Sequence, residues 1–204
     1  MPLETVLSSE RIRFNRTEIA NMWQGFMMGR PDDVSVYLED FHYYTAADWT
    51  ISDTGANTQA LATAAPTAGG VLLITVANAD DNLSSMQKVG HSFVPTAGTN
   101  IWYAARFQAS EATEIDLLHG LVVTDTTQFA HVNGIVFRKD DGDTTIDFGQ
   151  TNTSVTSTDS STTVFAAATY VTVGFKVTGT TSVEYFINGT SQGTLSGNVP
   201  TAPL

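Results

Sequence analysis

The sequence lacks cysteine and is poor in positive charge. None of its 204 residues is a cysteine, and nine Lys and Arg stand against 21 Asp and Glu, which gives a formal net charge of −12. Without cysteine, neither disulfides nor thiolate metal sites can contribute to stability. The negative charge argues against nucleic acid or an anionic membrane surface as the main partner, because both would repel the chain.

Long apolar runs are also missing. Nowhere do 18 apolar residues follow one another, and the first residues do not combine a basic segment with the apolar segment of an export signal. We therefore expect no membrane span, and we expect synthesis in a cytoplasm. Hydrophobic residues make up 42% of the chain, which is enough for the core of one large all-β domain.

The few positive charges are spread unevenly and divide the chain near Pro31. Residues 1–31 hold four arginines and three glutamates, whereas the rest of the chain holds five basic side chains and eighteen acidic ones. Apolar residues of the basic head fall on one face of a helix that Gly29 and Pro31 would end. The sequence predicts an arm at 1–34, with the sandwich domain at 35–204. The arm either docks on a partner protein or packs on its own domain, through Arg11, Arg13, Arg16, Met22, Trp23, Phe26, Met27 and Arg30.

After the arm the pattern changes to short strands separated by turns. The clearest stretch is 170–195, where apolar and polar residues alternate and Asn188-Gly189 supplies a type I′ hairpin turn. Residues 151–163 are rich in Ser and Thr, which predicts a long loop or a weak exposed strand. Many short strands at such spacing predict an antiparallel two-sheet sandwich. The other predicted strands are 35–41, 48–53, 58–62, 71–77, 84–94, 101–109, 115–123, 134–139 and 144–149.

The order of these segments carries a resemblance. EDF, DWT, GGVLLITV, DNLSSMQ, IWYAARFQ, DLLHGLVVTD, GIVFRKDDGD and YVTVGFKVTGTTSVEYFINGT follow one another over roughly residues 36–200. In this order they resemble the concanavalin A-like (laminin-G-like) jelly roll and, more narrowly, its version in structural proteins of tailed-phage virions. The resemblance implies an all-β jelly roll. Together with the arm it implies a capsid cement or decoration protein, made in the host cytoplasm, that contacts a major capsid or other virion protein and forms homo-oligomers.

The end of the chain departs from this family. The fold usually adds a final strand after such a meander, but the sequence ends nine residues after Leu195. Either that strand lies outside the sequence, or the sheet has an open edge that a strand from a partner could complete. A short tail without a partner is the alternative.

One segment resembles an enzyme motif. Glu114, Asp116 and His119 resemble the E-I/L-D-x-x-E strand of laminarinase and agarase-type glycoside hydrolases. In that family the first Glu is the nucleophile, the Asp tunes it and the last Glu is the acid/base. His119 replaces the last Glu, and retaining hydrolysis needs two carboxyl groups. The sequence therefore predicts that the chain is not an enzyme, and that the Glu-x-Asp alternation lies on the wet face of a strand.

Glycan binding is the alternative function. Sugar rings stack on exposed aromatics, and Trp102 shares a predicted strand face with Arg106 and Gln108. These three residues predict a glycan contact on a virion surface or fibre. The competing interpretation is that such aromatics pack under loops or against a neighbouring subunit.

Calcium is the one cofactor that the sequence suggests. Asp140, Asp141 and Asp143 surround Gly142 and could place several oxygen ligands near one point. Asp-Gly is also a common hairpin turn, which explains the same residues without a metal.

Overall fold

The computed structural model describes residues 35, 37–62, 70–77, 81–90 and 92–204. The predicted arm at 1–34 lies outside the described residues, so its helix and its boundary stay predictions. The chain divides into two units, Met1–Tyr43 with Leu61–Val71 and Tyr44–Ala60 with Leu72–Leu204. No helix in the described ranges is long and apolar enough to cross a membrane.

In the first unit the predicted strand at 35–41 is wrong, because its described residues form a loop. A local bond competes with sheet pairing here: the Phe41 N–H donates to Glu39 Oε1 at 3.1 Å. The Gly70 N–H donates to the Asp40 carbonyl at 2.9 Å. A Cβ at Gly70 would lie 1.6 Å from the Phe41 carbonyl oxygen, so only glycine allows this close approach.

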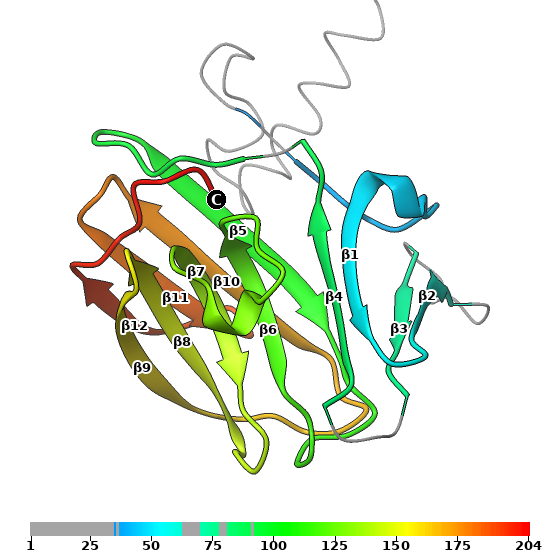
Figure 1. The fold of residues 1–204 in the computed structure, drawn as a ribbon. Helices are drawn as coiled ribbons and strands as arrows, with labels where there is room; N and C mark the ends of the chain where they lie inside the picture. The colour runs from blue at the N-terminus through cyan, green and yellow to red at the C-terminus, as the bar shows by residue number, and fades with distance from the viewer. Residues whose placement is uncertain (1–34, 36, 63–69, 78–80, 91) are drawn as a thin grey trace, which may run out of the picture. The chain divides into compact units, whose positions relative to one another are not determined.

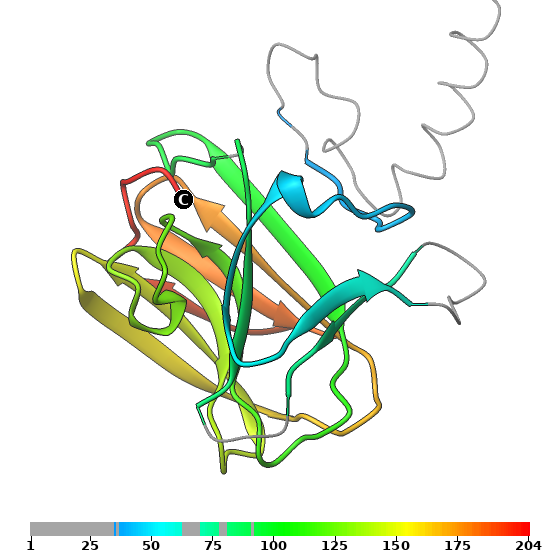
Figure 2. The same cartoon turned by 45° about the vertical axis from the view of Figure 1, so that its right-hand side comes forward.

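The second unit contains two four-stranded antiparallel sheets that lie face to face (Figures 1 and 2). The first, which we call the meander sheet, has the order β12-β11-β10-β5, with β5 at Asn100–Phe107, β10 at Val171–Thr178, β11 at Ser182–Ile187 and β12 at Thr190–Ser196. The second, the facing sheet, has the order β6-β7-β8-β9, with β6 at Leu117–Val122, β7 at Gly134–Lys139, β8 at Thr145–Asn152 and β9 at Val155–Val164.

Shorter elements complete the described chain. Strand β1 (Trp49–Thr54) pairs antiparallel with β4 (Leu83–Lys88), and β2 (Thr58–Leu61) pairs with β3 (Leu72–Thr75). Two 3-10 turns are η1 (Ala46–Asp48) and η2 (Gln128–Ala130). The all-β, antiparallel two-sheet jelly roll predicted from the sequence is confirmed.

Alternation along the strands builds the core between the two sheets. On β10 the odd-numbered residues are buried and the even-numbered ones face outwards, which is the period-2 pattern predicted for this stretch. Across the interface the Phe148 ring stacks on the Tyr185 ring with centroids 4.5 Å apart. The core residues contributed by β7, β8, β10 and β11 are Ile135, Phe137, Ile146, Phe148, Val171, Val173, Phe175, Val177, Val183, Tyr185 and Ile187.

Two details of the predicted connections can be checked. Asn188 and Gly189 have φ values of +51° and +77°, as a type I′ turn requires, so this hairpin is confirmed. Of the Ser/Thr-rich stretch 151–163, residues 155–163 form the strand that was one of its two predicted alternatives: β9 pairs with β8 along the edge of the facing sheet.

The two sides of the sandwich differ. On one side the edge strands β9 and β12 meet, since the Tyr185 hydroxyl donates to Asp159 Oδ2 at 3.0 Å and a Cβ at Gly193 would lie 2.9 Å from the same oxygen. On the other side β5 and β6 are the edges of their sheets, and no described strand pairs with the free edge of either. We call this the open side.

The tail after β12 packs back onto the domain. Leu204 and Phe93 exchange two backbone hydrogen bonds of 3.0 Å, and the side chains of Val199 and Leu204 are buried. The tail therefore packs on its own domain, and β12 keeps an outer edge that no described strand covers, so completion of this edge by a partner stays a prediction.

Candidate functional site

The outer face of the meander sheet gathers aromatic rings and positive charges. Side chains alternate along β5, so Trp102 and Arg106 point to solvent while Tyr103 points into the core. Trp102 is 48% exposed. In the pairing of β5 with β10, Trp102 lies opposite Lys176 and Arg106 lies opposite Thr172. Residues from two strands that are distant in sequence thus share one surface.

Each of the two cations on this surface lies over an aromatic ring. Lys176 Nζ is 5.2 Å from the centroid of the Trp102 ring, and Arg106 Cζ is 4.1 Å from the centroid of the Tyr170 ring. Attraction between a cation and a ring face contributes about 0.5–1 kcal/mol at exposed sites, so each pair keeps its charge beside its ring. We call Trp102, Arg106, Tyr170 and Lys176 the aromatic–cation face.

Small residues separate the two pairs. Ala104 lies between Trp102 and Arg106 on β5, and its partner on β10 is Gly174. A Cβ at Gly174 would lie 2.9 Å from the Tyr103 carbonyl oxygen, so glycine allows the two strands to approach here. The strand rise places Trp102 and Arg106 about 13 Å apart along β5. The surface between the two pairs therefore carries no large side chain from either strand.

The sequence identifies half of this face. It places Trp102 and Arg106 together, as the structure does, whereas Gln108 is an exposed residue beyond the end of β5. Sequence reasoning misses Tyr170 and Lys176, because nothing in the sequence says that β10 pairs with β5. The alternation of residues 170–178 does indicate that Tyr170 and Lys176 lie on the polar face of that strand.

The motif that resembles a hydrolase does not form one cluster. His119 pairs with Phe137 of β7, so its side chain points between the sheets. Glu114 and Asp116 precede β6; Glu114 is exposed, and Asp116 Oδ1 accepts the Asp141 N–H at 2.7 Å. The two carboxylates therefore belong to a loop, and the histidine belongs to the interlayer.

His119 lies on the open side. Its ring stacks on Phe107 with centroids 5.2 Å apart, and the Tyr103 hydroxyl bonds to its Nδ1. Apolar atoms crowd the imidazole although one side of it reaches solvent. This desolvation lowers the pKa of His119 to about 4 and raises the pKa of Tyr103 above its usual value. At pH 7 His119 is therefore neutral and accepts the hydrogen bond that Tyr103 donates.

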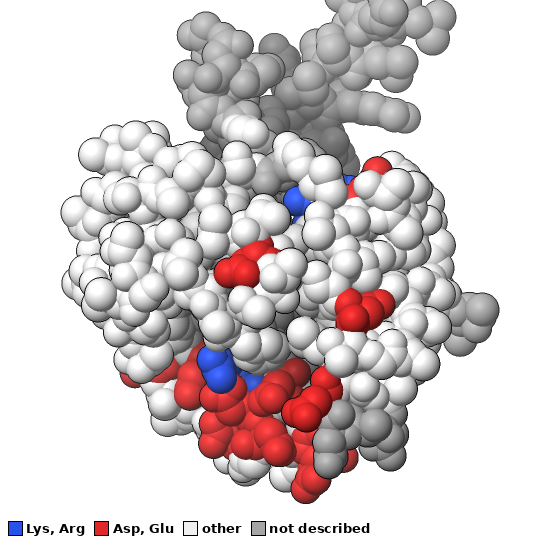
Figure 3. Space-filling model, viewed as in Figure 1, with Lys and Arg blue, Asp and Glu red and all other residues white. Residues whose placement is uncertain are grey.

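Two acidic loops, 111–116 and 140–143, are joined at one end of the sandwich, and Figure 3 shows acidic side chains gathered at one end of the face in view. The Gly142 N–H donates to the Thr113 carbonyl at 2.9 Å. Beneath them Lys139 is only 1% exposed, and its Nζ donates to the carbonyls of Thr113, Ile115 and Asp140 at 3.2, 3.0 and 2.9 Å. A buried ammonium therefore ties both loops to the core.

The predicted calcium ligands lie in the second acidic loop. Asp140 pairs with Arg138 Nε, and the Asp143 N–H donates to the Asp140 carbonyl at 3.0 Å in a turn where Gly142 has a φ of +81°. Across the described residues, no group of three or more His, Asp or Glu side chains is arranged to hold a metal ion. These residues build a hairpin turn, and calcium binding here stays a prediction.

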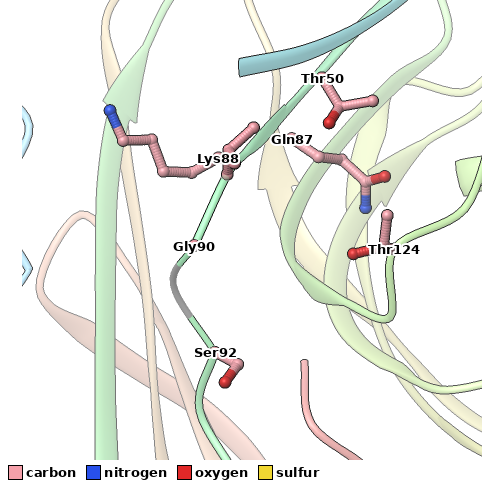
Figure 4. Close-up of a pocket in the computed structure, with 7 residues that line it drawn as sticks. Thr50, Gln87, Lys88, Gly90, Ser92 and Thr124 are labelled. Atoms are coloured by element: carbon pink, nitrogen blue, oxygen red, sulfur yellow. The ribbon is translucent and has the colours of Figure 1, made fainter. Parts of the chain in front are cut away.

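A surface cavity of about 420 Å³ lies beside β1 and β4 (Figure 4). The Gln87 side chain points towards Thr124, whereas Lys88 points away from it. The Gln87 amide bonds to the Val123 carbonyl at 3.3 Å and accepts the Asp125 N–H at 3.0 Å. Because these bonds already occupy the amide, the cavity is a weaker candidate for a ligand than the aromatic–cation face.

No protein-family model and no curated protein matches the chain, so the comparison rests on structure. The Bacillus licheniformis β-glucanase matches with a TM-score of 0.59 and 15% identity, over 81% of this chain and 79% of that chain. The cellulose induced protein Cip1 matches at 0.53 and 16%, over 79% and 76%. The endo-1,3-β-glucanase from Streptomyces sioyaensis matches at 0.52 and 13%, over 83% and 78%.

These matches bear on two predictions. The prediction that the chain is not an enzyme is contradicted, because solved structures with its fold include two glucanases and a glycosidic hydrolase. None of the three proteins described above is named as a virion protein, so the place of the chain in a phage particle stays a prediction. At 13–16% identity the matches show the fold alone. The chain has the concanavalin A-like jelly-roll fold of these β-glucanases.

Proposed function

We propose that the chain binds glycans on the aromatic–cation face. The observation that carries this proposal is Trp102, a large ring that is 48% exposed on the outer face of the edge strand β5, with the Lys176 ammonium beside it. An indole ring offers a flat apolar surface to the C–H face of a sugar, and Lys176 can donate to that sugar's hydroxyls. Arg106, about 13 Å away along β5, can donate to another sugar of the same glycan. The fold supports the proposal, since two of the structures that share it are named as glucanases.

Isothermal titration against soluble glycans, beginning with β-1,3-glucan and mixed-linkage glucan, tests the proposal. Trp102→Ala should weaken binding at least about tenfold, as expected for an aromatic anchor at the centre of a contact. Trp49→Ala is the matched control, because Trp49 also lies under a lysine, Lys88 Nζ at 5.0 Å, but on β1. Binding that survives Trp102→Ala unchanged, with both variants folded, would count against this face.

Hydrolysis of the bound glycan is a second candidate function. It is favoured by the fold and by two acidic residues in the loop that precedes β6, the exposed Glu114 and, two positions later in the sequence, Asp116. A carboxylate pair is what glycoside hydrolysis requires, and Asp116 is the nearest carboxyl group to Glu114 in sequence. Release of reducing ends from a polysaccharide, lost in Glu114→Gln and retained in Glu111→Gln, would support it. Equal release by both variants would assign the activity elsewhere.

The predicted setting is the surface of a phage virion, where the chain would contact a capsid protein as a homo-oligomer. Glycan binding is compatible with that setting, because a glycan contact on a particle would attach it to a surface, and many copies multiply a weak contact. Co-purification with intact particles tests the setting, and loss of that association on deleting residues 1–34 tests the arm. A truncated chain that still associates normally would contradict anchoring by the arm.

A further inference from the structure

We infer that the glycan taken by the aromatic–cation face is an anionic polysaccharide, one that carries carboxylate or sulfate groups. This inference rests on the proposed function and adds the chemical class of the ligand. It starts from the scarcity of positive charge: residues 32–204 hold only five basic side chains, and two of them lie on this one face. The two cations make this face locally positive although the chain as a whole carries a net charge of −12, and it is this local charge that favours an anionic ligand here.

The other three basic side chains are engaged within the protein. Lys139 is buried and bonds to three carbonyls. Arg138 pairs with the Asp140 carboxylate, and Lys88 Nζ lies 3.5 Å from Asp48 Oδ2. Each of these charges is therefore already compensated by a group of the chain itself.

Arg106 and Lys176 differ from them. Within the described part of the chain, neither has a carboxylate at ion-pair distance, and each contacts a ring instead. Glu184 lies opposite Lys176 in the sheet, and its Oε1 accepts the Ser191 hydroxyl at 2.8 Å, so this carboxylate keeps its charge but forms no ion pair with Lys176. The two charges on this face thus remain available to an anionic group of a ligand.

The spacing selects a polymer over a single sugar. Trp102 with Lys176 forms one contact point and Arg106 with Tyr170 forms the other, about 13 Å away along β5. Ala104 and Gly174 leave room between them for a chain lying along the strand. A ligand must therefore be several residues long, with a ring over Trp102 and an anionic group within reach of each cation.

Two matched pairs of polymers test the charge requirement: dextran sulfate against dextran, and polygalacturonate against its methyl ester. The wild-type chain should bind the charged member of a pair about three- to tenfold more tightly, as two exposed ion contacts allow. The preference should fall as salt is added, because exposed charges are screened. Monomeric galacturonate should not compete with the polymer. The carboxylated and the sulfated polymers together show which anionic group is preferred.

Variants separate this inference from the proposed function. Arg106→Gln with Lys176→Gln should remove the preference for charged polymers, while Lys88→Gln, a lysine that also lies over a tryptophan, should leave it unchanged. Equal binding of charged and neutral polymers, a preference that survives the double variant, or affinity that rises with salt would overturn the inference and leave glycan binding standing. Binding of no polymer of either kind would overturn both.

Discussion

Replacing Lys139 by Met should destabilise the protein by about 3 kcal/mol, which makes this one buried charge a main support of the acidic end of the sandwich. Lys139 occupies an inward position at the end of β7, where it is 1% exposed, and its Nζ donates three hydrogen bonds. Met keeps the length and the apolar stem of the side chain. The substitution therefore removes the charge and its bonds with little change in volume.

The magnitude follows from opposing terms. Hydrogen bonds to a charged donor contribute about 1.5–3 kcal/mol each, so losing three would cost roughly 5–9 kcal/mol if nothing offset them. Met does not need the several kcal/mol that desolvation of an ammonium requires, and this offsets part of the loss. Water reaching the carbonyls of Thr113, Ile115 and Asp140 offsets more. About 3 kcal/mol remains, which corresponds to about 1 kcal/mol for each carbonyl that loses its donor.

Urea denaturation measures the change in the free energy of unfolding. Lys88→Met is the matched control, because the Lys88 pair with Asp48 is partly exposed and should contribute less than about 1 kcal/mol. Hydrogen exchange adds a local test. The Asp141 and Gly142 amides bond to Asp116 Oδ1 and the Thr113 carbonyl, so both should lose protection in the Met variant.

A Lys139→Met variant whose free energy of unfolding changes by less than about 0.5 kcal/mol, the size of an ordinary surface substitution, would show that Lys139 does not support this end of the sandwich. A more stable variant would show the same, since desolvation of the ammonium would then outweigh its three bonds. Unchanged protection of the two amides would show that the loops are held by something else.

Three further predictions concern the sandwich. The folded pKa of His119, about 4, lies below its ordinary value of 6.5, so its contribution to stability is fully present above pH 6.5 and is lost as the pH falls through 4. Because the ring is partly exposed, the expected loss in the free energy of unfolding is reduced to roughly 1–2 kcal/mol, measured by urea denaturation at pH 6.5 and pH 4. A His119→Gln variant that loses the same stability between these pH values would contradict the assignment to His119. Gly120→Ala would place a Cβ 2.2 Å from the Ile135 carbonyl oxygen and force β6 away from β7. The free energy of unfolding, measured by urea denaturation, should therefore fall by more than about 3 kcal/mol. A smaller fall would mean that the backbone moves at little energetic cost. Gly189→Ala, at a φ of +77°, should cost about 1 kcal/mol and lower the melting temperature, unless the turn changes type.

The meander shows what a sequence predicts well. Residues 170–178 alternate strictly, Val183, Tyr185 and Ile187 continue the pattern, and an Asn-Gly turn follows. These signals are local, so the structure reproduces the strands and a type I′ hairpin. β9 shows the opposite case. Its Ser and Thr residues have no apolar face to mark a strand, and it forms because β8 offers a free edge beside it.

In the hydrolase-like motif, the spacing of the residues in the sequence indicates which side chains can share a face of a strand. Asp116 and His119 are three positions apart, and in a strand an odd offset puts two side chains on opposite faces. The offset alone therefore argues against a shared site for these two residues unless a bulge intervenes. The pairing of His119 with Phe137 agrees, because it turns the imidazole into the interlayer.

The aromatic–cation face could not be predicted in full from the sequence. Whether its two cations are open to a ligand depends on which basic side chains of the domain form internal bonds. In the sequence the five basic residues of the domain look alike. Lys139 is not available to a ligand because the loop carbonyls of residues 113 and 115 accept its hydrogen bonds. Arg138 is not available because a turn places the Asp140 carboxylate beside it. Lys176 forms no ion pair with Glu184, its neighbour across the sheet, whose carboxylate accepts the Ser191 hydroxyl. Each of these contacts depends on strand register or on the conformation of a loop. The charge that this face presents to a ligand is therefore set by the folded sheet and not by the composition.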